Sequence, residues 1–332
     1  MKQKKRKILN KNKLVAIALC AIISVGTSTL GVSAKEHEAK DAEIARIGFF
    51  DSLFGSVDSS NPEEQIEEYE KNYKGLKTIA NKNVNAYEKR TLFINGKSAS
   101  ALAIRIGDED YIPFRQAANL LGASYYYDSP SGTSVMTLSG LSISATSGNY
   151  VIYANGRTVF SDSPTVIMND GRMYIPLDIF SKAIGISPSV SSSEIRFLGS
   201  ISPLKSADRF YREDEVFWLA RIIHAESRGE PLLGQIAVGN VVLNRVRSSE
   251  YPNTIYGVIF DKKYGVQFSP IIDGSIYNTP SYSATLAAKI CLESFDISEG
   301  SLFFLRPEMS TSSWIPNNRP YSFSIGKHDF YK

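Results

Sequence analysis

An internal repeat is the feature that most constrains how this 332-residue chain folds. The segment 111–122 is matched by the segment 174–185: both begin with Tyr-Ile-Pro, continue with a partly apolar run and end at glycine. An Asn-Gly pair, typical of tight β-hairpins, precedes each copy, at positions 95–96 and 155–156. Each copy therefore predicts a hairpin, a strand, a helix that starts at proline and a glycine stop. We expect two α+β units that pack as a pair within residues 91–199.

The first 34 residues have the pattern of a secretory signal. Seven Lys or Arg residues and no acid are followed by an apolar run, Leu14 to Val25, and then by small residues that end at Ala34. An uncleaved membrane anchor is the alternative, because residues 14–32 approach the ~20 residues that span a bilayer. The polar residues at 27–29 favour cleavage after Ala34. We therefore expect a secreted, extracellular protein with residues 1–34 removed as signal peptide.

Charge and cysteine content narrow the remaining possibilities. Without the seven N-terminal cations the chain has 30 basic and 34 acidic side chains, a net charge of −4, which argues against nucleic acid as a partner. Of the two cysteines, Cys20 leaves with the signal, so Cys291 has no partner for an internal disulfide. The fold must rest on apolar cores. The sequence requires no integral membrane partner and leaves the oligomeric state open.

Residues 35–90 are charged and contain only modest helical patterns. Cap residues at 58–61 and Pro62 predict a helix that runs to about Tyr73, with a thin apolar face. We interpret residues 35–90 as a linker with a spacer helix.

The repeat region, residues 91–199, resembles the copper amine oxidase N-terminal-like domain of exported proteins. Both Tyr-Ile-Pro helices and both Asn-Gly hairpins carry this resemblance. The region has no His and no Cys, so we expect no copper site. Attachment to the wall or to glycan and a role as a spacer remain open alternatives.

Residues 206–332 contain the candidate chemistry. Apolar residues at helical spacing predict one helix over about 215–227 with a stop at Gly229, and Pro231 predicts the start of a second helix over 232–246. The second helix is too apolar for the surface and is expected to be buried. Glu226 then lies in the last turn of the first helix, facing the second. A partly apolar setting raises the pKa of a carboxyl group, which suits a general acid at neutral pH.

This region resembles the spore cortex-lytic cell wall hydrolase family over about 125 residues. The shared motifs are Ala225-Glu226-x-Arg228-Gly229-Glu230-Pro231, Val241–Val246, Pro252–Phe260, Gln267-Phe268-Ser269, Leu302–Pro307 and Ile325–Tyr331. The resemblance implies a lysozyme-like α+β fold for residues 206–332 and peptidoglycan, typically of the spore cortex, as substrate. It further implies lytic transglycosylation between N-acetylmuramic acid and N-acetylglucosamine, and an association with the cell wall or the spore during germination.

The resemblance also assigns candidate site residues. It implies that Glu226 is the catalytic acid and base. The resemblance further implies that Gln267 and Ser269 contact sugar. By residue type and position, Asp273, Tyr277 and His328 are further candidates, with a structural hydrogen bond as the alternative for His328. Trp314 and Tyr321 offer flat faces for sugar rings, although core packing is the stronger expectation for Trp314. Glu230 is expected to be structural, as a helix cap or an Arg partner. Asn244 and Arg245 are expected to tie loops.

The number of suitable carboxylates decides between reaction types. Hydrolases of glycosides usually place two carboxylates beside the scissile bond, and the sequence offers one clear acid, with Asp273 or Glu230 in reserve. A lytic transglycosylase is therefore favoured over a simple muramidase hydrolase, and an inactive wall-binding protein is the non-enzymatic alternative. Zinc chemistry lacks ligands at the required spacing, and Cys291 lies in an apolar helical run. We expect no metal and no cofactor.

Overall fold

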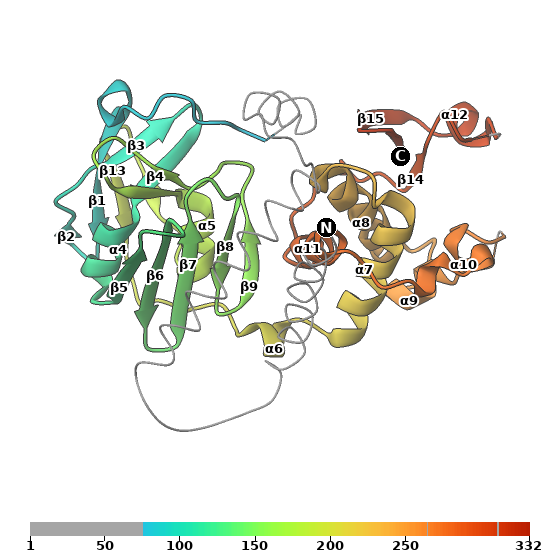
Figure 1. The fold of residues 1–332 in the computed structure, drawn as a ribbon, viewed down its shortest axis with the longest axis horizontal. Helices are drawn as coiled ribbons and strands as arrows, with labels where there is room; N and C mark the ends of the chain where they lie inside the picture. The colour runs from blue at the N-terminus through green and yellow to red at the C-terminus, as the bar shows by residue number, and fades with distance from the viewer. Residues whose placement is uncertain (1–75, 264, 311) are drawn as a thin grey trace, which may run out of the picture. The chain divides into compact units, whose positions relative to one another are not determined.

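The computed structural model describes residues 76–332 except 264 and 311, and these residues combine helices and strands (Figure 1). The chain divides into two compact units, and all described residues belong to the second, Ala39–Lys332. The predicted signal at 1–34 and the predicted helix after Pro62 lie outside the described residues. Within the described part, no helix is long and apolar enough to cross a membrane. The predicted α+β class is confirmed.

Residues 88–197 form two β-sheets with two short helices. The larger sheet has the order β10-β11-β4-β3-β1-β13-β12, with β2 also paired to β1, and only the β1–β13 pair is parallel. The smaller sheet is an antiparallel meander from β5 to β9. The strands are β1 (Glu88–Ile94), β2 (Lys97–Ser98), β3 (Ala103–Ile106), β4 (Glu109–Pro113), β5 (Ser124–Asp128), β6 (Thr133–Leu138), β7 (Leu141–Thr146), β8 (Val151–Ala154), β9 (Arg157–Phe160), β10 (Val166–Ile167), β11 (Met173–Pro176), β12 (Ser189–Val190) and β13 (Glu194–Phe197).

The two copies of the repeat fold alike, as predicted. Both Asn-Gly pairs form the turns of hairpins, β1–β2 and β8–β9, with positive φ at both positions. Helices α4 (Phe114–Leu121) and α5 (Leu177–Ile184) begin directly after proline and end at a left-handed glycine, Gly122 or Gly185. The equivalent strands β4 and β11 pair with each other, Ile112 opposite Ile175, so the two copies share one sheet.

The last residues of the expected linker, 76–90, are part of the fold and are not a linker. Leu76 and Ile79 are buried in hydrophobic clusters, a 3₁₀ helix, η1, spans Val84–Ala86, and β1 already begins at Glu88.

Three helices form the core of the C-terminal region. Helix α8 (Leu232–Arg247) is buried over most of its length and packs against α7 (Glu213–Ser227) and α11 (Tyr282–Leu292). Gly239 permits the close approach, because a Cβ there would lie 2.7 Å from Cys291 Sγ and 2.8 Å from Ile223 Cδ1. The smaller helices are α6 (Ala207–Phe210), α9 (Ile255–Ile259), α10 (Pro270–Asp273), the 3₁₀ helix η2 (Ser275–Tyr277) and α12 (Trp314–Asn318).

A small antiparallel sheet covers part of α8. Its order is β14 (Phe303–Leu305), β16 (His328–Tyr331) and β15 (Tyr321–Ile325). Phe330 is fully buried and packs on Ala237, Val238 and Val241 of α8. The sheet thereby places His328, the first residue of β16, close to the start of α8.

A buried ion pair links strand β9 to the end of α11. The guanidinium of Arg157 donates to both carboxylate oxygens of Glu293, at 2.8 and 2.7 Å, and the Tyr211 hydroxyl donates to the same carboxylate. Burial raises the pKa of Glu293, but these hydrogen bonds and the charge of Lys182, 3.3 Å away, outweigh it and lower the pKa below its ordinary value. Glu293 is therefore held as an anion.

Candidate active site

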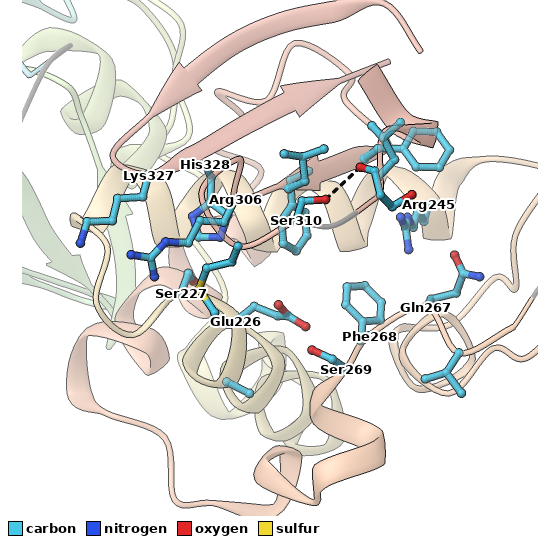
Figure 2. A pocket seen from close by; sticks show the side chains of 18 of the residues that line it. Glu226, Ser227, Arg245, Gln267, Phe268, Ser269, Arg306, Ser310, Lys327 and His328 are labelled. Carbon is cyan, nitrogen blue, oxygen red and sulfur yellow. Dashed lines mark hydrogen bonds between the residues drawn. The ribbon is translucent and has the colours of Figure 1, made fainter. Parts of the chain in front are cut away.

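A cavity of about 1530 Å³ lies at the C-terminal end of α7. The last turn of α7, the loop before α10 and the segment from β14 to α12 form its walls (Figure 2). Helix α7 ends at Ser227, with Arg228 as its C-cap residue and the predicted stop, Gly229, directly after it. Pro231 precedes α8 as predicted. The connection between α7 and α8 is short, so the packing of α7 on the buried α8 fixes the direction of the last turn of α7.

Glu226 lies in that last turn and points into the cavity (Figure 2). Burial raises the pKa of its carboxyl group from 4.5 to about 7; the negative charge of Asp273 adds to the rise and the positive charge of Arg245 opposes it. The carbonyl end of a helix carries partial negative charge, which further disfavours a carboxylate there. Glu226 is thus poised to hold and release a proton near neutral pH, as the sequence predicted.

The loop before α10 brings Gln267 and Ser269 to the cavity wall opposite Glu226. Phe268 between them is almost fully buried and anchors the loop in the hydrophobic core. The Gln267 amide donates to the carbonyl of Gly265 at 3.1 Å, and Ser269 is exposed. Both predicted sugar-contacting residues therefore present polar groups to the cavity.

Glu230 and His328 form a buried pair at the edge of the cavity. Glu230 accepts a hydrogen bond from the backbone N–H of Lys327 at 2.8 Å, and its other oxygen lies 3.6 Å from His328 Nδ1. Burial lowers the pKa of His328, although the charge of Glu230 raises it in part. The expectation that Glu230 caps α8 or pairs with Arg was wrong, because Pro231 is the N-cap and the partners of Glu230 come from the β15–β16 turn.

Gly326 explains why this turn fits so closely on Glu230. Its φ of +58° is unfavourable for other residues, and a Cβ there would lie 2.0 Å from Glu230 Oε2. The turn and the Glu230 carboxylate thus pack in direct contact, which supports a structural role for Glu230.

Three predicted sugar-contacting residues, Asp273, Tyr277 and Tyr321, lie outside the cavity wall. Asp273 is exposed and accepts a hydrogen bond from the Ser275 backbone N–H at 2.8 Å. Tyr277 is 64% exposed and contacts Trp218 on α7. Asp273 still acts on the site through its charge, which raises the pKa of Glu226.

Several cavity residues had another role, or none, in the sequence analysis. Arg245 ties a loop as expected, since its Nε donates to the Leu302 carbonyl at 2.8 Å, but it also lines the cavity. Trp314, expected in the core, is 52% exposed and lines the cavity with Arg319. Further cations there are Arg228, Lys263, Arg306 and Lys327. The shared motif Leu302–Pro307 contains residues of this cavity wall, but the sequence analysis assigned no role to any of them.

Other chemistries find little support in the described residues. They contain no group of three or more His, Cys, Asp or Glu side chains arranged to hold a metal ion. Cys291 is buried in α11, donates to the carbonyl of Ile236 and has a pKa raised by burial, so it behaves as a core thiol.

Comparisons with known proteins agree with this geometry. Residues 229–331 match the Cell Wall Hydrolase family, and residues 93–195 match the Copper amine oxidase N-terminal domain. The C-terminal region is a cell wall hydrolase domain. A copper amine oxidase N-terminal-like domain precedes it in the chain.

The curated relatives match a little more than a third of this chain. A spore cortex-lytic enzyme of Bacillus cereus is 41% identical over 122 residues, which cover 37% of this chain and 46% of the relative. The spore cortex-lytic enzyme of Bacillus subtilis is 38% identical over 120 residues, 36% of this chain and 38% of the relative. The chain therefore spans less than half the length of these relatives. A solved catalytic domain of the germination-specific lytic transglycosylase SleB from Bacillus anthracis is 41% identical, with 37% of this chain and 97% of that chain covered and a TM-score of 0.34.

Proposed function

We propose that this protein degrades peptidoglycan as a secreted lytic transglycosylase that cleaves between N-acetylmuramic acid and N-acetylglucosamine. The observation that carries the proposal is Glu226: a carboxyl group with a pKa raised to about 7, in a large cavity of a cell wall hydrolase domain. The relatives named spore cortex-lytic enzymes support spore cortex as the form of peptidoglycan attacked.

The first step is a proton transfer from Glu226 to the glycosidic oxygen. The bond between this oxygen and C1 of the muramyl residue then breaks, and the leaving sugar departs with the proton as its new hydroxyl hydrogen. Positive charge develops on the muramyl ring, and the newly formed carboxylate of Glu226 stabilises it. A raised pKa is what this step requires, because the carboxyl group must still carry its proton near pH 7.

The second step uses the substrate as nucleophile. The carboxylate of Glu226 takes the proton of the muramyl 6-hydroxyl, and the hydroxyl oxygen forms a bond to C1, which closes a 1,6-anhydro ring and restores the acid. An internal nucleophile has a large effective concentration, so no second carboxylate is needed to hold a water molecule. The placement of Asp273 outside the cavity and of Glu230 under the β15–β16 turn favours this route over hydrolysis.

The charge of the cavity fits the substrate class. Its walls carry six Arg or Lys side chains in addition to the acids Glu226, Glu230 and Glu250. Peptidoglycan bears carboxylates on its peptide stems and acyl oxygens on its sugars, and such groups accept hydrogen bonds from guanidinium and ammonium donors. The aromatic faces of Phe304 and Trp314 add apolar surface for sugar rings.

Incubation of the protein with purified cortex peptidoglycan tests the proposal. We expect soluble muropeptides to appear in the supernatant, and we expect none from an equal amount of the Glu226→Gln variant. Binding of the wild-type protein to the peptidoglycan without release of fragments would instead favour the inactive wall-binding alternative.

A further inference from the structure

A group of aromatic side chains, three of them exposed and two partly buried against the hydrophobic core, lies on the cell wall hydrolase domain outside the cavity. We call these five residues the aromatic platform: Phe217 and Trp218 of α7, Tyr256 of α9, Phe260 directly after α9, and Tyr277 of η2. Trp218 is its centre, with ring centroids 5.0 to 6.4 Å from those of the other four. Phe217, Tyr256 and Tyr277 are 42%, 54% and 64% exposed. Such a concentration of exposed rings is typical of a binding surface.

The platform is continuous with the cavity along two segments of chain. On α7, Trp218 precedes the cavity residue Ala225 by seven residues, which is two helical turns or about 10 Å along one face of the helix. The segment from Ser269 to Tyr277 covers the same path: Ser269 and Ile272 line the cavity, and η2 contacts α7 and places Tyr277 on Trp218. Ile272 is 76% exposed and bridges the two areas.

We propose that the aromatic platform binds the part of a glycan strand that extends beyond the cavity. This inference rests on the proposed function and adds a second contact area for the same polymer. The apolar C–H faces of sugar rings stack on exposed aromatic rings, so the rings of Tyr256 and Tyr277 carry the contact. Arg221, whose guanidinium lies 3.6 Å from the ring centroid of Phe217, adds a positive charge beside the rings. A polymer that leaves the cavity along α7 meets the platform next.

Strand length provides the experiment. The double variant Tyr256→Ala/Tyr277→Ala is compared with wild type on soluble glycan strands, one set long enough to cross both areas and one set of fragments that fill the cavity alone. We expect KM for long strands to rise about tenfold, the order that two lost aromatic stacks give, with kcat unchanged and with KM for short fragments within about twofold. The variant Tyr256→Phe/Tyr277→Phe keeps both rings and should behave as wild type. The matched control is Tyr126→Ala, which removes a tyrosine of β5 that is 44% exposed and should change neither KM.

Several results would overturn the inference. An unchanged KM for long strands would do so, and so would an equal rise in KM for both lengths, which would place the effect in the cavity. A loss of self-association in sedimentation without a change in KM would make the platform a contact between copies of this chain. A binding measurement separates this inference from the proposed function. Long strands are bound to the Glu226→Gln variant and to the same variant with Tyr256→Ala and Tyr277→Ala, and equal binding by these two variants would refute the platform. A wild-type protein that cleaves no peptidoglycan would refute the proposed function instead.

Discussion

Replacement of Glu226 by glutamine should abolish cleavage and, at the same time, stabilise the fold at alkaline pH. Glutamine keeps the shape of the side chain but has no transferable proton. Loss of a general acid lowers the rate by ~10²–10⁴ or more. The variant also gains stability, because burial makes the charged carboxylate of Glu226 unfavourable in the folded protein and glutamine carries no charge.

The raised pKa of Glu226 sets the size of the stability effect. The folded state holds the proton more tightly than the unfolded chain, so the cost of ionisation is absent well below pH 4.5, accumulates as pH rises to about 7 and is complete above it. A shift of this size corresponds to ~3 kcal/mol as an upper bound, and water at the open cavity reduces it to about 1–2 kcal/mol. The variant should therefore unfold at higher urea concentration than wild type at about pH 8, and at the same concentration at about pH 4.

The assay pairs urea unfolding at both pH values with release of muropeptides. Glu213→Gln is the matched control, since Glu213 is an exposed glutamate at the other end of α7. It should leave cleavage intact and slightly lower stability, because a carboxylate in the first turn of a helix is favourable. Near-full activity of Glu226→Gln would refute the assignment of the acid. Equal stability of variant and wild type at about pH 8 would refute the desolvation of this carboxyl group.

Three further predictions concern the surroundings of the site. Asp273→Asn removes a charge that raises the pKa of Glu226, so the alkaline limb of the pH–rate profile should move to lower pH; an unchanged midpoint would contradict this coupling. Glu293→Gln leaves Arg157 buried without its counter-charge and should lower the free energy of unfolding by ~3 kcal/mol, measured by urea titration, whereas a loss below ~1 kcal/mol would show that the pair is dispensable. Cleavage should continue unchanged with a chelator present, because the described residues offer no metal-holding group; inhibition that added metal reverses would contradict this.

The repeat domain was predictable because its boundaries are local. Proline and glycine limit the backbone wherever they occur, so the starts of α4 and α5 and their ends at Gly122 and Gly185 could be located from sequence. The similarity of the two copies predicted that they pack as a pair, but not that β4 pairs with β11, which the structure adds. The position of Glu226 in the last turn of α7 was predictable for the same reason, since one helical pattern and one proline fix the end of α7 and the start of α8, whereas its role as the acid rests on the family resemblance.

The far wall of the cavity depends on long-range packing and could not be located in the same way. Trp314 and Lys327 follow Glu226 by about 90 and 100 residues, and no local pattern indicates that they return to it. An apolar side chain is expected in the core, yet Trp314 is half-exposed because α12 lies at the cavity rim. Conversely, Asp273 and Tyr277 follow cavity residues closely in sequence but do not line the cavity. The Asp273 carboxylate accepts a hydrogen bond from the Ser275 backbone N–H, and Tyr277, after the left-handed turn at Gly274, contacts Trp218 of α7.

Digestion of purified glycan strands in water enriched in the heavy isotope of oxygen tests the reaction most directly. We expect products with 1,6-anhydro-muramyl ends, each product pair lighter by one water than hydrolysis gives, and no heavy oxygen at the new ends, because the muramyl 6-hydroxyl and not water attacks C1. Reducing muramic acid ends that carry the heavy isotope would contradict this expectation, and would mean that water attacks C1 with the help of a second carboxylate.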